Sequence, residues 1–167
     1  MGQNKKKSRT LVNVIGIPCL LGVIWQGGTI FSIFVGVVMV LGAFELCSLA
    51  KTDDKSNPSL ALMLVGVVGI CMLYSCLSNY YNYQIYWLML IVMVAMFFEV
   101  FRLKEGALLN ISIVAFAMIW IGLMIGSMIM IRNIAEYGFV ITLSMFLSVW
   151  ICDTFAFFFG TKFGKKK

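Results

Sequence analysis

Six apolar segments separated by short polar breaks make up most of the chain. A transmembrane helix needs about 20 consecutive, predominantly apolar residues. Five of the segments are close to that length, and the first is short at fifteen residues. We predict an all-α, polytopic membrane protein with about six transmembrane helices in a single transmembrane domain over residues 1–167. The expected helices are residues 11–25, 29–49, 59–77, 85–101, 108–131 and 138–159.

Basic residues gather on one side of this pattern. When the breaks are assigned alternately to two sides, twelve of the thirteen Lys and Arg residues share a side with both termini. Arg132 alone lies on the other side. Because cytoplasmic loops carry an excess of Lys and Arg, we predict that both termini are cytoplasmic. An unprocessed basic start favours the bacterial cytoplasmic (inner) membrane, and the basic flanks need no nucleic acid to explain them.

Composition supports the membrane assignment and removes several kinds of chemistry. The chain is 62% apolar and 12% charged, whereas soluble domains are roughly 45–50% apolar and about 25% charged. It has no histidine, so catalysis and metal sites that need an imidazole are excluded. Its five cysteines include no C-x-x-C pair and are expected to pack as small apolar residues. Gly122 and Gly126 form a G-x-x-x-G spacing that allows close helix approach.

The carboxylates divide into ordinary and unusual ones. Glu99 precedes Arg102 by three residues, a spacing that permits a local ion pair. Glu45 lies near a helix end and can reach the interface. Asp153 instead lies six residues before the expected helix end at Phe159, roughly 9 Å inside the span. An unpaired carboxylate at that depth has a large free-energy cost, so Asp153 is the leading candidate for a functional residue.

Small residues recur every fourth position along the last apolar segment. This spacing makes a narrow stripe on which a neighbouring backbone can pack, and Asp153 lies on its flank, about 100° from Cys152. We therefore expect the Asp153 carboxylate to face other protein or a polar cavity rather than lipid. The stripe consists of Ser144, Ser148, Cys152, Ala156, Gly160 and Gly164.

Glycines and lysines alternate after Asp153, with Lys162 and Lys165 as the first two lysines. Lysines can bind phosphate oxygens, glycines allow the backbone to come near, and a carboxylate can hold Mg²⁺. A nucleotide triphosphate or a phospholipid headgroup would suit this stretch. A basic stop after the last span explains the lysines equally well, but it explains neither the glycines nor Asp153.

Residues 150–165 resemble the phosphatidate cytidylyltransferase (CDP-diacylglycerol synthase) family. That family shows a Trp, then Asp-[ST]-Gly-Ala-Tyr, then a Gly-, Lys- and Phe-rich stretch, and this chain has Trp150, Asp153-Thr154-Phe155-Ala156-Phe157 and the stretch from Gly160 to Lys165. Weaker matches lie at residues 9–18 and 43–49. Two positions depart from the pattern, because Phe155 replaces a glycine and Phe157 replaces a tyrosine.

The resemblance implies an enzyme that joins CTP and phosphatidate into CDP-diacylglycerol and pyrophosphate with Mg²⁺ in a lipid bilayer. It assigns Asp153 to catalysis or the metal, and Lys162, Lys165 and Thr154 to substrate binding. The family continues beyond the position matched by Lys167, so we expect this chain to be the amino-terminal portion and inactive alone. Two alternatives stay open: a non-catalytic scaffold or assembly subunit that docks a partner through the stripe, and a transporter with Asp153 in its pathway. A homodimer also stays open.

Overall fold

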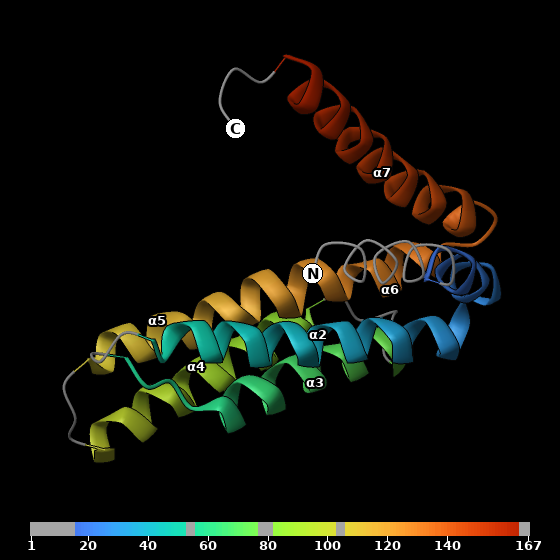
Figure 1. Cartoon of the computed structure of the whole chain (residues 1–167). Helices are drawn as coiled ribbons and strands as arrows, with labels where there is room; N and C mark the ends of the chain where they lie inside the picture. The colour runs from blue at the N-terminus through green and yellow to red at the C-terminus, as the bar shows by residue number, and fades with distance from the viewer. Residues whose placement is uncertain (1–15, 53–55, 77–81, 103–105, 164–167) are drawn as a thin grey trace. The chain divides into compact units, whose positions relative to one another are not determined.

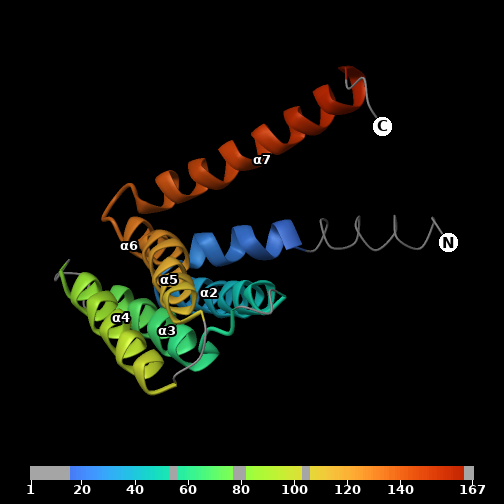
Figure 2. The same cartoon turned by 90° about the vertical axis from the view of Figure 1, so that its left-hand side faces the viewer.

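The structure, a computed structural model, describes residues 16–52, 56–76, 82–102 and 106–163, and every regular element in these ranges is helical (Figures 1 and 2). The all-α prediction is therefore confirmed. Four helices are long and apolar enough to cross a membrane. They are α2 (Gly28–Ala50), α4 (Tyr83–Arg102), the continuous helix Ala107–Arg132 and α7 (Gly138–Phe163).

Two further apolar helices are shorter. They are Gly16–Gln26 and α3 (Leu60–Cys76). The helix Leu60–Cys76 falls within its predicted segment, and Gly16–Gln26 ends one residue beyond the predicted end at residue 25. Residues 11–15 and Leu77 lie outside the described residues. The structure thus gives four candidate spans, and the count of six stays a prediction.

The chain forms two compact units. One comprises residues 28–130 and is called the bundle below; the other comprises residues 1–27 and 131–167 and is called the α7 unit. Each is described by itself, and the single-domain organisation of the whole chain stays a prediction.

The bundle places α2, α3, α4 and the helix that starts at Ala107 side by side (Figures 1 and 2). Helices that follow one another in sequence are in contact, and α3 also packs against the middle of the fourth helix. The carboxyl ends of α2 and α4 and the amino ends of α3 and α5 lie at the same end of the bundle (Figure 1). This is the end that the charge pattern assigns to the cytoplasm.

The fourth helix changes its winding in the middle. It runs as α5 (Ala107–Ala117), then as the π-helix η1 (Met118–Ile125), then as α6 (Gly126–Arg132). Sequence periodicity did not predict the π segment. Its residues Met118, Ile121 and Gly122 are buried, so the wider turn forms where this helix packs on its neighbours.

Two glycines allow the fourth helix to pack closely against α3. A Cβ atom added to Gly122 would lie 2.7 Å from Cδ1 of Ile70, and one added to Gly126 would lie 2.9 Å from Cδ2 of Tyr74. Both contacts are with α3. The Gly122–Gly126 spacing therefore serves the close helix approach that the sequence suggested.

The α7 unit contains the short helix Gly16–Gln26 and α7. Gly27 ends the first helix with a φ of 62°, a conformation that favours glycine. Arg132, the one basic residue predicted on the outer side, donates from Nε to the Ile24 carbonyl at 2.7 Å and from Nη2 to the Trp25 carbonyl at 2.9 Å. This guanidinium joins two segments more than a hundred residues apart.

Helix α7 continues beyond its predicted end. The sequence analysis ended the last span at Phe159, but the helix runs to Phe163. Thr161 satisfies its hydroxyl by donating to the Phe157 carbonyl at 2.9 Å, and Lys162 lies in the last turn, where a cation complements the helix dipole. The glycine at position 160 is therefore helical and does not open a loop.

Candidate functional site

Three of the residues predicted for catalysis and binding, Asp153, Thr154 and Lys162, lie exposed along the second half of α7. Asp153 makes no hydrogen bond or ion pair with any residue that the structure describes. Thr154 donates its hydroxyl to the Trp150 carbonyl at 2.7 Å, within its own helix. The Lys162 Nζ lies 5.3 Å from the centre of the Phe158 ring. These side chains are available to a ligand, but they do not contact one another.

Helix geometry separates the carboxylate from the first lysine. Asp153 and Lys162 are nine residues apart in a helix that runs without a break to Phe163. Nine residues advance about 13 Å along the axis and about half a turn around it. The structure therefore does not bring Asp153 and Lys162 to one phosphate group. Lys165 and Gly164 lie outside the described residues.

The described part of the small-residue stripe, up to Gly160, is also exposed. Ser144 and Ser148 donate their hydroxyls to the carbonyls of Val140 and Met145 in the same helix. A Cβ atom on Gly160 would have no neighbour within 4 Å. Cys152 and Ala156 are exposed as well. The expectation that Asp153 faces other protein or a polar cavity stays a prediction.

A second polar cluster, at the end of the bundle, was found only in part by the sequence analysis. The predicted Glu99–Arg102 ion pair is confirmed, with Oε1 and Nη1 3.2 Å apart. The other carboxylate oxygen of Glu99 accepts a hydrogen bond from Nδ2 of Asn110 at 3.2 Å. Asn110 in turn accepts from the Asn57 backbone N–H at 2.7 Å. Arg102 closes the ring by donating from Nη1 to the Asn57 carbonyl at 2.6 Å.

This ring ties three parts of the bundle together: the segment before α3, the end of α4 and the start of α5. The Glu99 side chain is only 4% exposed, and Asn110 is buried too. A buried charge is tolerated when it is paired and hydrogen-bonded. An amide at position 110 in an apolar segment could have pointed to such a partner, since a buried amide needs one.

The remaining carboxylates in the described ranges are exposed. Glu45 and Glu136 are exposed, whereas Asp53, Asp54 and Glu105 lie outside the described residues. In the described ranges no three His, Cys, Asp or Glu side chains are grouped so that they could hold a metal ion. Asp153 can still supply one oxygen ligand, which suits Mg²⁺ because that ion often uses one or two carboxylates together with substrate phosphates.

Comparison with known proteins identifies the family. The profile of the cytidylyltransferase family matches residues 7–167. Curated phosphatidate cytidylyltransferases from Staphylococcus aureus strains COL, MSSA476 and MW2 are each 25% identical to this chain over 161 residues. The match covers 96% of the chain and 60% of each relative, so the chain spans about three fifths of their length. No solved structure matches. The chain belongs to the cytidylyltransferase family.

Proposed function

We propose that this chain is the part of a CTP:phosphatidate cytidylyltransferase that carries residues 150–165, called the Asp153 segment below. The observation that carries the proposal is the family match over residues 7–167, which includes that segment. The matched relatives are named phosphatidate cytidylyltransferase. The whole enzyme would form CDP-diacylglycerol and pyrophosphate in phospholipid biosynthesis, in a bacterial cytoplasmic membrane.

The reaction is a nucleotidyl transfer. A phosphate oxygen of phosphatidate bonds to the α-phosphorus of CTP while the bond from that phosphorus to pyrophosphate breaks. The protein's contribution to such chemistry is positioning and charge neutralisation. Mg²⁺, when bound, would neutralise charge on the triphosphate.

The residues around and after Asp153 would divide this work. Asp153 would hold the metal ion or order the site, Lys162 and Lys165 would bind phosphate oxygens, and the Thr154 hydroxyl would be a further donor. Because Asp153 and Lys162 lie on opposite sides of α7, they would contact different phosphate groups. Lys162 lies in the last turn of α7, where we expect the helix to reach the membrane interface, so it would bind the lipid phosphate.

A chimera tests the proposal. This chain replaces the matching part of a Staphylococcus aureus relative, and the chimera is assayed for CTP-dependent formation of CDP-diacylglycerol from phosphatidate and Mg²⁺. We expect activity, and an at least hundredfold loss with Asp153→Asn, since a residue that stabilises transition-state charge typically contributes about that much. The control Glu136→Gln, in an exposed turn, should retain activity. A membrane-inserted but inactive chimera, beside an active parent, would contradict the proposal.

The chain alone is expected to be inactive. Purified and reconstituted with phosphatidate, CTP and Mg²⁺, it should give no CDP-diacylglycerol. A lipid product from this preparation that disappears with Asp153→Asn would show that residues 1–167 contain a complete site, and would overturn the inactivity prediction while supporting the family activity.

The exposure of the stripe favours a second candidate, a scaffold that docks a partner helix. Ser144, Ser148 and Cys152 are exposed on α7, and small residues allow helices to approach closely. Crosslinking in membranes through Cys152 tests it. Robust crosslinks to a different protein favour the scaffold, and their absence leaves the cytidylyltransferase proposal as the better one. The transporter alternative rests on Asp153 alone and stays a prediction.

A further inference from the structure

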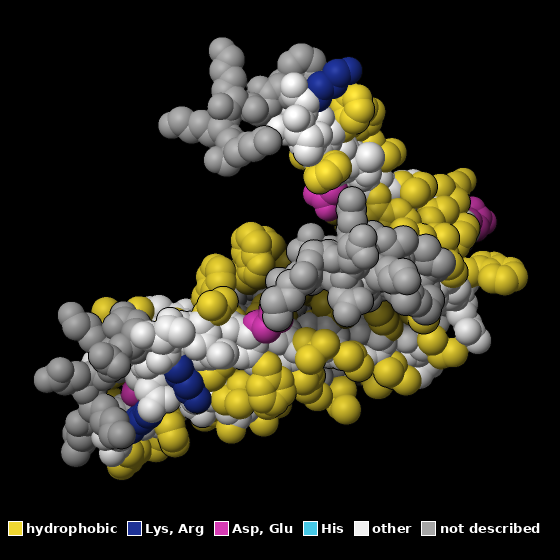
Figure 3. All heavy atoms as spheres, viewed as in Figure 1, with side chains coloured by type: hydrophobic (Ala, Val, Ile, Leu, Met, Phe, Trp, Pro, Cys, Tyr) yellow, Lys and Arg dark blue, Asp and Glu magenta, His cyan; other side chains and the backbone are white. Residues whose placement is uncertain are grey.

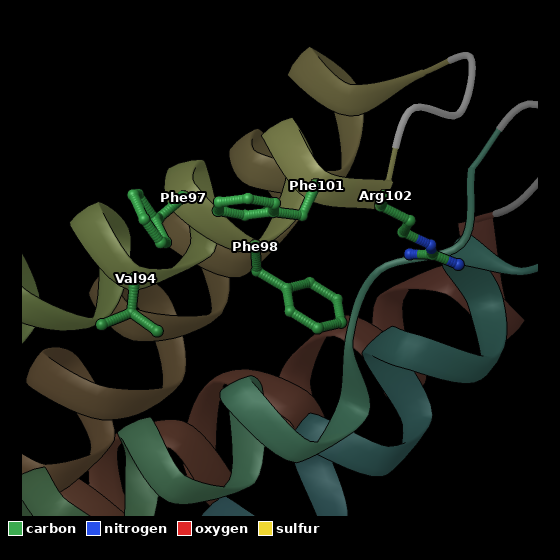
Figure 4. A pocket seen from close by; sticks show the side chains of 5 residues that line it. All are labelled: Val94, Phe97, Phe98, Phe101 and Arg102. Carbon is green, nitrogen blue, oxygen red and sulfur yellow. The ribbon is translucent and has the colours of Figure 1, made fainter.

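A groove lies along one face of α4, far in sequence from the Asp153 segment (Figure 4). Its volume is about 320 Å³, at the lower end of the range typical of ligand sites. The lining residues follow the spacing i, i+3, i+4, i+7 and i+8, so they share a face over roughly 12 Å. They are Val94, Phe97, Phe98, Phe101 and Arg102.

The groove is apolar along its length and cationic at its end. Phe97 and Phe101 are 67% and 70% exposed, and their rings pack edge to face with centroids 4.8 Å apart. Hydrophobic side chains cover much of the described surface between the helix ends (Figure 3). Since α4 is one of the candidate membrane spans, we expect the groove to open toward hydrocarbon. An acyl chain is the group that the bilayer would place there.

Arg102 stands at the end of the groove and points toward the segment before α3 (Figure 4). Its Nη1 is held by the Asn57 carbonyl and by Glu99. No described residue accepts a hydrogen bond from its Nε or Nη2, and 19% of its side chain is exposed. Within the described ranges, the guanidinium is therefore fixed through Nη1, and its Nε and Nη2 donors have no acceptor.

Those two donors suit a phosphate. Guanidinium groups bind phosphates through two parallel N–H···O bonds, and such charge-assisted bonds are roughly twice as strong as neutral ones. Glu99 offsets part of the positive charge, but its other oxygen is occupied by Asn110. The preference for a phosphate thus depends on the fixed fork of Arg102 as well as on its charge.

We propose that the α4 groove binds an acidic glycerophospholipid of the cytoplasmic leaflet. One acyl chain would lie against Val94, Phe97 and Phe101, and the phosphate would accept hydrogen bonds from Arg102. The match is one of shape and charge: the apolar groove on a candidate membrane span ends at the cation Arg102, in the last turn of α4. The site uses only residues of the bundle, so it does not rest on the proposed transfer reaction.

Native mass spectrometry of the full chain tests the site, with palmitoyl-oleoyl phosphatidylglycerol and the phosphatidylcholine of the same chains as probes. Phosphatidylglycerol is chosen because it is acidic and is not the proposed substrate. We expect tighter retention of phosphatidylglycerol. Val94→Trp fills the groove from an exposed position and should weaken that retention about tenfold, equivalent to about 1.4 kcal/mol.

Matched variants separate the groove from general effects. Val100→Trp makes the same change at an exposed α4 position that does not line the groove, and should bind as the wild type does. Arg102→Lys keeps the charge but removes the fork, and should lower the preference for phosphatidylglycerol. Lys51→Gln removes an exposed positive charge near the same end of the bundle and should have little effect. Thermal unfolding of each variant checks that it is folded.

Several results would overturn the proposal. Equal loss with Val94→Trp and Val100→Trp would show that the groove is not the site. Equal retention of the two lipids by the wild type would remove the role of acidity, and equal losses with Lys51→Gln and Arg102→Lys would indicate diffuse charge attraction. Loss of a dimer with Val94→Trp, without any change in lipid retention, would assign the groove to a second copy of the chain. Because Val94→Trp leaves the Arg102 hydrogen bonds intact, the test holds even where Arg102→Lys fails to fold.

Discussion

Glu99 and Asp153 are carboxylates in apolar helices of the two units, and they differ in burial and in hydrogen-bond partners. Glu99, in the bundle, is buried and bound on both oxygens, by Arg102 and by Asn110. Asp153, in the α7 unit, is exposed and has no partner among the described residues. The contrast teaches that an acidic residue in a membrane helix has a structural role where the fold satisfies it, and is a candidate for function where the fold leaves it free.

Removing each carboxylate would test this contrast most strongly. We expect Glu99→Ala to lower the free energy of unfolding by about 3–5 kcal/mol, because Arg102 and Asn110 would lose their partner in a buried setting. Asp153→Ala should change it by less than about 0.5 kcal/mol, as for other exposed positions. Thermal or denaturant unfolding in detergent measures both. Equal effects would show that Asp153 has a structural partner.

The next largest difference that we expect between the units is in the loss of stability when a glycine is replaced by alanine. A Cβ atom on Gly69 would overlap the Trp87 ring, and that ring donates from Nε1 to the Gly66 carbonyl at 3.0 Å. We expect Gly69→Ala to destabilise the bundle by about 1–3 kcal/mol, as overpacking does. Gly160→Ala, where nothing lies within 4 Å, should be neutral or slightly stabilising, since alanine is the better helix former. The same unfolding assay compares the two.

Arg132 shows that the α7 unit also contains ordered polar contacts. Arg132→Gln removes the hydrogen bonds to the carbonyls of Ile24 and Trp25. We expect a loss of about 1 kcal/mol, typical of such hydrogen bonds at a partly exposed position. Lys162→Gln also removes one positive charge, at an exposed position, and should have a smaller effect on the free energy of unfolding. If the two variants unfold alike, the link between the first helix and Arg132 contributes nothing measurable.

The smallest effect is expected on the stripe. Ser148→Leu should alter the unfolding of the isolated chain by less than about 0.5 kcal/mol, because Ser148 is exposed and its hydroxyl bonds only to its own helix. The same variant should impair crosslinking through Cys152 if a partner helix packs on the stripe, since a larger side chain keeps backbones apart. A marked loss of stability in the isolated chain would instead show that the stripe already packs against this protein.

Several features could be predicted from the sequence because they depend on local chemistry. The length of the apolar segments predicts membrane helices, and the structure confirms the all-α class. The three-residue spacing of Glu99 and Arg102 predicts their ion pair, because side chains three positions apart meet on a helix. The segment around Asp153 predicts the family, and the family match bears this out.

Other features depend on which faces of the helices meet, and a membrane helix hides that choice. Its lipid-facing and protein-facing sides are both apolar, so hydrophobic periodicity does not distinguish them. Only the tertiary structure shows that Phe31, Val35 and Met39 of α2 face inward, that Asn57 and Asn110 complete the Glu99 ring, and that η1 forms a π-helix. These contacts join residues far apart in the chain. The sequence by itself determined the helices, the charge at their ends and the family; the packing between helices decided which polar residues are satisfied and which are left free.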